Sequence, residues 1–90
     1  MATVNFSHRI LTEDRNRDAV ISILSKYFES FSLVPQLGYW KGQSEPSIAI
    51  EIIGAAYADV LRACREIREV NNQEAVLIFS VTGKSTLVNA

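Results

Sequence analysis

The spacing of apolar residues switches repeatedly between two periods along this chain, and the order of the switches constrains the fold more than any other feature. Apolar residues at every second position indicate a strand with one buried face, whereas recurrence at three and four positions indicates an amphipathic helix. Alternation is found in residues 3–11, 31–40 and 48–53, helical spacing in 19–28 and 57–68, and a nearly continuous apolar run in 75–81. The chain is therefore predicted to have the element order βαββαβ.

Local signals predict the boundaries of these segments. Thr12–Asp14 predicts a helix start, because a hydroxyl can accept from free N–H groups and two acids suit the positive helix end. Lys41–Pro46 has turn composition, and a short loop between two alternating strands predicts an antiparallel hairpin. Gly54 breaks the third strand, and Asn71–Asn72 is suited to end the second helix.

The sequence also predicts where each strand lies in the sheet. Pro35 cannot donate to a neighbouring strand, so residues 31–40 are expected at a sheet edge or at a bulge. The run 75–81 suits a central strand buried on both faces. Residues 86–88 are expected to add a short fifth strand.

One domain spanning residues 1–90 accommodates all of these elements, because the chain has no linker and no room for a second core. Two right-handed crossovers place both helices on one face of a four-stranded antiparallel sheet. This is the ferredoxin-like arrangement of the α+β class. It hosts many unrelated functions, so the fold by itself names none.

The sheet face opposite the helices is uncovered in a monomer of this fold. If Leu33, Leu37 and the isoleucines of residues 48–53 point to the helices, then apolar side chains that include Val34, Trp40, Ala49 and Ile53 point away from them. Such a face is too apolar to stay in contact with water. We therefore expect a homo-oligomer, a dimer or a trimer, whose sheets pack together.

Charge and composition exclude several classes of protein. The formal net charge is −1 with acids and bases interleaved, which argues against a nucleic-acid binder. A single cysteine, Cys64, excludes an internal disulfide or a cysteine-based zinc site. With no signal-like segment and no apolar run long enough to span a bilayer, we expect a cytoplasmic protein that uses no cofactor or metal. The arginines are interpreted as solvated helix faces rather than a basic patch: Arg15, Arg17, Arg62, Arg65 and Arg68.

Four features outside the hairpin have candidate chemistry, and a structural interpretation is favoured for most of them. Gly83–Thr86 resembles the end of a phosphate-binding loop, but Ile78 stands where that motif needs glycine, so a polar turn is favoured. His8 is the only histidine, and a structural role is favoured over a general base. Cys64 lies in an apolar helical stripe and is expected to be packed and inert. Glu51 interrupts an isoleucine-rich strand, either to oppose aggregation or as a paired carboxylate.

The hairpin tip is the most informative stretch of the sequence. Tyr39 and Trp40 can stack on a flat ring, Lys41 can meet an anion, and Gly42 and Glu45 add a flexible position and an acid. These five residues are the predicted ligand-binding site. The alternative is that the two aromatic residues pack in an oligomer interface while Lys41 and Glu45 are solvated.

The same stretch resembles the CutA family and, more distantly, the nitrogen-regulatory PII family. CutA-like chains have a Trp-x-Gly pattern before a Glu near the second hairpin, and Trp40, Gly42 and Glu45 match this in kind, although the acid comes earlier here. The cysteine-bearing segment of CutA and the phosphate-binding glycines of PII are absent. The resemblance implies a trimer with clefts between subunits, and regulatory or small-ligand binding. No catalytic or metal role is carried over.

Three functions remain open from the sequence. The first is a non-enzymatic, oligomeric binding or regulatory protein that holds a small anionic or nucleotide ligand between subunits near the hairpin. The second is a small enzyme of the dimeric α+β barrel type, in which His8 or Glu51 transfers a proton on the uncovered sheet face. The third is a protein-interaction module, such as a phage or plasmid factor that binds a host protein through its edge strand.

Overall fold

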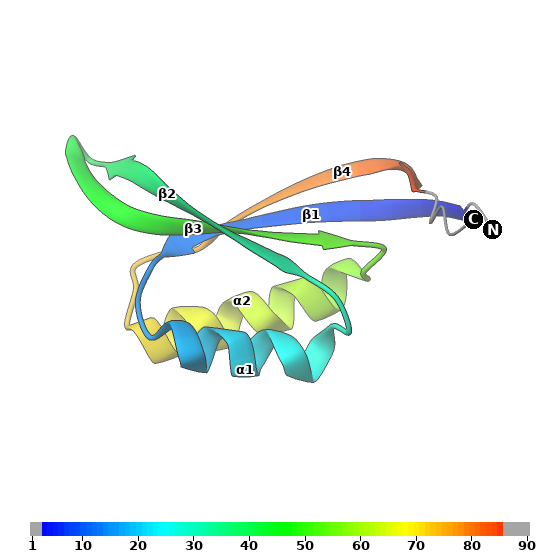
Figure 1. Cartoon of the computed structure of the whole chain (residues 1–90), viewed down its shortest axis with the longest axis horizontal. Helices are drawn as coiled ribbons and strands as arrows, with labels where there is room; N and C mark the ends of the chain where they lie inside the picture. The colour runs from blue at the N-terminus through cyan, green and yellow to red at the C-terminus, as the bar shows by residue number, and fades with distance from the viewer. Residues whose placement is uncertain (1–2, 86–90) are drawn as a thin grey trace.

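The computed structural model describes residues 3–85, with side chains described for residues 7–81. Four strands and two helices follow one another in the predicted order βαββαβ (Figure 1). The elements are β1 (Thr3–Glu13), α1 (Arg17–Tyr27), β2 (Ser32–Trp40), β3 (Gln43–Ile53), α2 (Tyr57–Asn71) and β4 (Leu77–Ser85).

The four strands form one sheet in the order β2-β3-β1-β4, and every neighbouring pair is antiparallel. Both helices cover the same face of this sheet, and the other face carries no element of the described chain (Figure 1). The predicted ferredoxin-like α+β fold is therefore confirmed. The expected edge position of β2, inferred from Pro35, is also confirmed by the strand order.

The hydrophobic core lies between the sheet and the two helices. Ile10 of β1 and Ile48, Ile50 and Ile52 of β3 are buried there. From the helices the core receives Val20, Ile23, Leu24, Val60, Ala63, Cys64 and Ile67. Burial raises the pKa of the Cys64 thiol to about 12, so this cysteine stays protonated and packs as a small apolar side chain.

The predicted helix start at Thr12–Asp14 is wrong. β1 continues to Glu13, and α1 begins only at Arg17, after Asn16 in a left-handed conformation with φ 49°. The reason is tertiary: Thr12 continues the buried parity of Ile10, and its hydroxyl donates to the side chain of Gln73 rather than capping a helix. A partner 61 residues away in the sequence has overridden the local signal.

The prediction of a central strand at 75–81 is also wrong, because β4 starts at Leu77 and lies at a sheet edge. Both faces of β4 nevertheless carry apolar side chains. Ile78 packs towards the core, whereas Leu77 and Phe79 are 59% and 57% exposed on the uncovered face. The expected fifth strand at 86–88 lies outside the described residues.

The uncovered sheet face, called the open face below, is apolar as expected. Its exposed apolar side chains are Val34, Ile53, Leu77, Phe79 and Val81. Leu37 was expected to face the helices but is 63% exposed, because the β2–β3 hairpin extends past the helix ends (Figure 1).

The hairpin turn is shorter than the predicted Lys41–Pro46 loop. Trp40 pairs directly with Gln43, so only Lys41 and Gly42 form the turn, and residues from Gln43 onward belong to β3. Both turn residues have positive φ, 51° for Lys41 and 79° for Gly42. This is the signature of a type I′ turn, which matches the twist of the two strands.

Gly42→Ala is expected to lower the free energy of unfolding by about 1–2 kcal/mol, because an L-residue at positive φ is strained even though no atom lies within 4 Å of the added Cβ. Thermal or urea unfolding measures this change. Lys41→Asn is the control: Asn-Gly is preferred in this turn, so no loss is expected. A Gly42→Ala protein as stable as the parent would contradict the turn geometry.

Candidate functional site

A pocket of about 410 Å³ lies between the β2–β3 hairpin and the segment that joins α2 to β4. We call it the hairpin pocket. Its walls come from β1, from both strands of the hairpin, and from the residues that follow α2. The lining residues are Leu11, Thr12, Glu13, Gln36, Gly38, Tyr39, Trp40, Glu45, Ser47, Gln73, Glu74, Ala75, Val76 and Leu77.

The five predicted site residues all lie at or beside this pocket. Tyr39, Trp40 and Glu45 line it, with Tyr39 and Trp40 73% and 52% exposed. Lys41 does not line it, but its Nζ lies 3.2 Å from Oε1 of the lining residue Glu74 and 5.7 Å from the ring centroid of Trp40. Gly42 forms the turn. That these residues bind a ligand stays a prediction.

The charge of the hairpin pocket is negative. Three carboxylates line it, those of Glu13, Glu45 and Glu74, and no Lys, Arg or His side chain is among the lining residues in the part of the chain that the structure describes. Glu13 has Arg15 at 3.3 Å, and Glu74 has the exposed Lys41. Among residues 7–81, no cationic side chain pairs with Glu45.

Sequence reasoning missed several residues of this pocket. Glu13 and Glu74 were not placed near the hairpin, and Gln73 was not singled out at all. Gln73 and Thr12 are 7% and 4% exposed, so they are buried polar residues among those that line the pocket. The one available signal was a threonine that follows Val4, Phe6 and Ile10 at the same strand parity, a parity that is apolar apart from His8.

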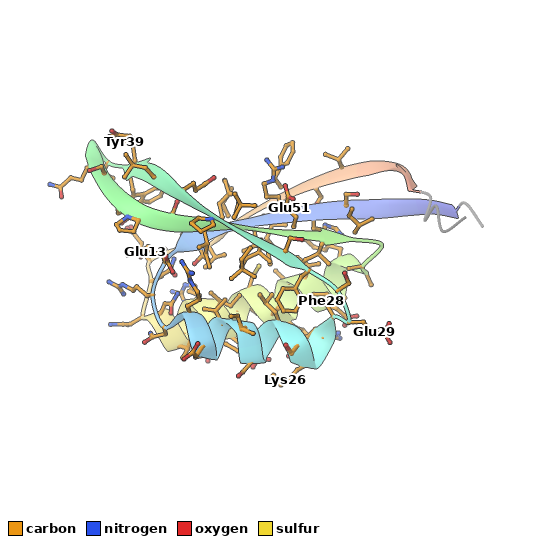
Figure 2. All side chains as sticks on the ribbon, in the orientation of Figure 1. Glu13, Lys26, Phe28, Glu29, Tyr39 and Glu51 are labelled. Atoms are coloured by element: carbon orange, nitrogen blue, oxygen red, sulfur yellow. The ribbon has the colours of Figure 1, made fainter. Side chains whose placement is uncertain are left out.

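His8 and Glu51, the candidate proton-transfer groups, lie on opposite faces of the sheet. His8 is buried on the helix side, with Nδ1 2.8 Å from the Ser80 hydroxyl and Nε2 3.0 Å from the Ala55 carbonyl oxygen. Since a carbonyl only accepts, Nε2 carries the proton that is donated to Ala55. Glu51 projects from the open face (Figure 2). It accepts from Arg9 at 2.5 Å, and both residues line a shallow hollow of about 240 Å³.

Among residues 3–85, no group of three or more His, Cys, Asp or Glu side chains is arranged to hold a metal ion. No described helix has both the length and the apolar character that a membrane crossing requires.

Comparison with known proteins gives a fold but no family. No family model matches the chain, and no curated protein matches it in sequence. A phage SAM lyase solved in complex with S-methyl-5'-thioadenosine has a TM-score of 0.69 and 24% identity, covering 91% of this chain and 89% of its own. The PII-like protein CPII from Thiomonas intermedia K12, bound to ADP, AMP and bicarbonate, has a TM-score of 0.72 and 10% identity, covering 99% and 100%.

Two other solved structures extend the group. A putative PII-like signalling protein from Thermus thermophilus has a TM-score of 0.64 and 16% identity over 93% of this chain and 90% of its own. A DUF3240 family protein from Shewanella baltica has a TM-score of 0.65 and 14% identity over 98% and 97%. The chain has the fold of PII-like proteins. The architectural resemblance to that group, inferred from the sequence, is thus confirmed.

Proposed function

We propose that this protein binds a small adenosine-containing molecule in the hairpin pocket, and that the preferred ligand is the cation S-adenosylmethionine. The observation that carries the proposal is the Glu45 carboxylate, which has no cationic side-chain partner in the described part of the chain and lines the pocket from the same face of the hairpin as Trp40. Such a pocket favours a ligand that has both an aromatic ring, which can stack, and a positive charge, which can pair with the carboxylate.

The negative charge of the pocket favours a cationic ligand over one that carries a phosphate group. Two unit charges 4 Å apart interact by roughly 4 kcal/mol at an effective dielectric of 20. Arg15 and Lys41 offset the charges of Glu13 and Glu74, so Glu45 is the lining carboxylate that would repel a phosphate group by a term of this order and attract a sulfonium or an ammonium. We therefore revise the anionic ligand expected from Lys41, because that lysine is directed to Glu74.

The structural neighbours support an adenosine-containing ligand. The phage SAM lyase was solved with S-methyl-5'-thioadenosine, and CPII with ADP and AMP. These ligands share the adenosine group and differ in the charge attached to it. The identity of 24% to the lyase, against 10% to CPII, favours the sulfur-containing ligand for this chain.

We further propose that the ligand is held between subunits of a homo-oligomer. Leu11 and Leu77 line the hairpin pocket and pair with each other in the β1–β4 register. Leu77 also belongs to the open face, so the pocket is continuous with that face. A second copy that covers the open face would therefore also form a wall of the pocket.

The reaction that fits such a site is cleavage of S-adenosylmethionine. The bond between sulfur and the γ carbon of the amino-acid chain breaks, and its electron pair stays on sulfur, which becomes the neutral thioether of S-methyl-5'-thioadenosine. The bond breaks as a carboxylate oxygen of the same amino-acid chain attacks the γ carbon, so the four-carbon fragment leaves as a five-membered lactone that keeps its ammonium group. The positive charge on sulfur is lost in this step, so Glu45 contributes to substrate binding, and the chain promotes the reaction by holding the carboxylate against the γ carbon.

Titration of the Trp40 fluorescence tests binding, since Trp40 is the only tryptophan. We expect S-adenosylmethionine and S-methyl-5'-thioadenosine to change the emission at micromolar concentrations, and chromatography of the incubated mixture to show S-methyl-5'-thioadenosine formed from S-adenosylmethionine. If no adenosine compound changes the emission or the melting temperature, the proposed function is wrong.

A regulatory protein that binds an adenine nucleotide without a reaction is the second candidate. It is favoured by Lys41, which lies over the Trp40 ring at the rim of the pocket and could reach a phosphate outside it. It predicts that ADP or AMP binds more tightly than S-adenosylmethionine and that no product forms. The same titration therefore decides between the two candidates.

A further inference from the structure

Gln73 is the most constrained polar residue of the hairpin pocket. It follows the end of α2, where Asn72 takes a left-handed conformation with φ 52°. The Asn72 N–H donates to the Glu69 carbonyl oxygen at 3.1 Å, and the Gln73 N–H donates to the Arg68 carbonyl oxygen at 3.0 Å. These bonds terminate the helix and fix the backbone from which the Gln73 side chain starts.

Three hydrogen bonds fix the orientation of the Gln73 amide. Its Oε1 accepts from the Thr12 hydroxyl at 2.6 Å and from the Asn71 amide at 2.7 Å, and its Nε2 donates to the Ala75 carbonyl oxygen at 2.9 Å. Turning the amide over would place two donors against each other at Asn71 and two acceptors against each other at Ala75. Only one orientation satisfies the neighbours.

One donor of this amide has no acceptor within the described chain. Both acceptor positions of Oε1 are used, and one of the two Nε2 hydrogens is bonded to Ala75. Gln73 is only 7% exposed, and it lines the hairpin pocket. The second Nε2–H is therefore a fixed, neutral donor on a residue that lines the hairpin pocket.

We propose that Gln73 is a specificity-determining residue that donates its second amide N–H to a ring nitrogen of the bound adenine. The proposal rests on the proposed function and adds the hydrogen bond that distinguishes adenine from other rings. The acceptor is a neutral one, because the unpaired Glu45 carboxylate disfavours an anionic group in this pocket. An acceptor in the plane of the ring is left accessible when Trp40 stacks on its face.

Thr12 acts as a positioning residue for this contact. Its hydroxyl holds Oε1, and so the direction of the Nε2 hydrogens, through a bond that is buried. Thr12 lies near the C-terminal end of β1 and its side chain is buried on the helix side of the sheet. A hydroxyl is needed there because it donates to Gln73. A buried, satisfied network of this kind restricts the amide to one state.

The test measures the affinities of adenosine and of its 1-, 3- and 7-deaza analogues, each of which lacks one ring nitrogen. For the wild-type protein we expect one of the three analogues to bind about 3- to 10-fold more weakly than adenosine. For Gln73→Met, which keeps the length of the side chain, removes both Nε2–H donors and places no acceptor against the Ala75 carbonyl, we expect this discrimination to disappear. Neither the variant nor the ligands introduce a charge.

Thr12→Val and Thr12→Ser supply a test that does not alter Gln73. We expect Thr12→Val to reduce the discrimination and Thr12→Ser to restore it. A merely structural role of the network would lower the melting temperature and weaken all four ligands equally, leaving the ratio unchanged. That result overturns the inference, as does a wild-type protein that binds adenosine and every analogue equally. A wild-type protein that binds no adenosine compound overturns the proposed function together with the inference.

Discussion

Replacing Glu45 with glutamine is expected to weaken the binding of S-adenosylmethionine at least about tenfold, while the binding of S-methyl-5'-thioadenosine changes less than about twofold. Glutamine preserves the size of the side chain and removes only its charge. Hydrogen bonds and close contacts between charged groups are worth about 1.5–3 kcal/mol, which corresponds to a factor of about 10 to 150 in the dissociation constant. The thioether ligand is uncharged at sulfur and has no ammonium, so it does not use this interaction.

Glu29→Gln is the matched control for Glu45→Gln. Glu29 is exposed and lies in the loop before β2, at the opposite end of the molecule from Tyr39 and the hairpin (Figure 2). Glu29→Gln changes the net charge by the same amount as Glu45→Gln, so a general electrostatic effect would appear in both variants. If Glu45→Gln weakens both ligands by the same factor, the carboxylate shapes the pocket and does not pair with the positive charge. An unchanged affinity for S-adenosylmethionine would contradict the proposed site.

The hairpin half of the candidate site could be predicted from the sequence because it is local. Tyr39, Trp40 and Glu45 lie within seven positions on two strands joined by a tight turn, so alternation and turn chemistry suffice to bring them together. The other half depends on the register of β1 and on the end of α2. Glu13 and Glu74 come from segments that only the completed sheet places beside the hairpin. No local sequence pattern predicts the register of β1 with its neighbouring strands.

The fold itself was predictable because the order of periods determines it. Two errors in the prediction, the helix start at Thr12 and the central strand at 75–81, have one physical cause, which is the partner that each segment meets in the folded chain. Thr12 resembles a helix cap until Gln73 is placed against it. The run at 75–81 resembles a central strand, but a strand at an edge needs the same apolar residues on both faces if another copy covers its open side.

Phe79→Arg is expected to convert an oligomeric wild-type protein into a monomer of 10.0 kDa. Phe79 is 57% exposed on the open face of the edge strand β4 and lies opposite Arg9 in the β1–β4 register. Arg9 is already paired with Glu51, so a second cation beside it has no free partner on this face among the described residues. Burying it between copies would cost several kcal/mol per subunit and forfeit about 1.5–3 kcal/mol of phenylalanine burial.

Size-exclusion chromatography with light scattering measures this effect, and Ile21→Arg is the matched control. Ile21 is 38% exposed on α1, in the layer that covers the other side of the sheet, so the same substitution there leaves the open face intact. The two penalties act in every subunit of the assembly, and we expect the dissociation constant of the oligomer to rise roughly 1,000-fold or more.

Phe79→Arg also tests whether ligand binding in the hairpin pocket depends on the oligomer. Phe79 does not line the hairpin pocket, so a monomeric Phe79→Arg protein keeps every pocket residue of its own chain. If a second copy supplies part of the wall beside Leu11 and Leu77, the monomer binds S-adenosylmethionine more weakly than the wild-type protein does. Equal affinity in the two proteins would mean that one chain forms the whole site. A wild-type mass of 10.0 kDa at micromolar concentration would exclude the oligomer, and the open face would then need another cover.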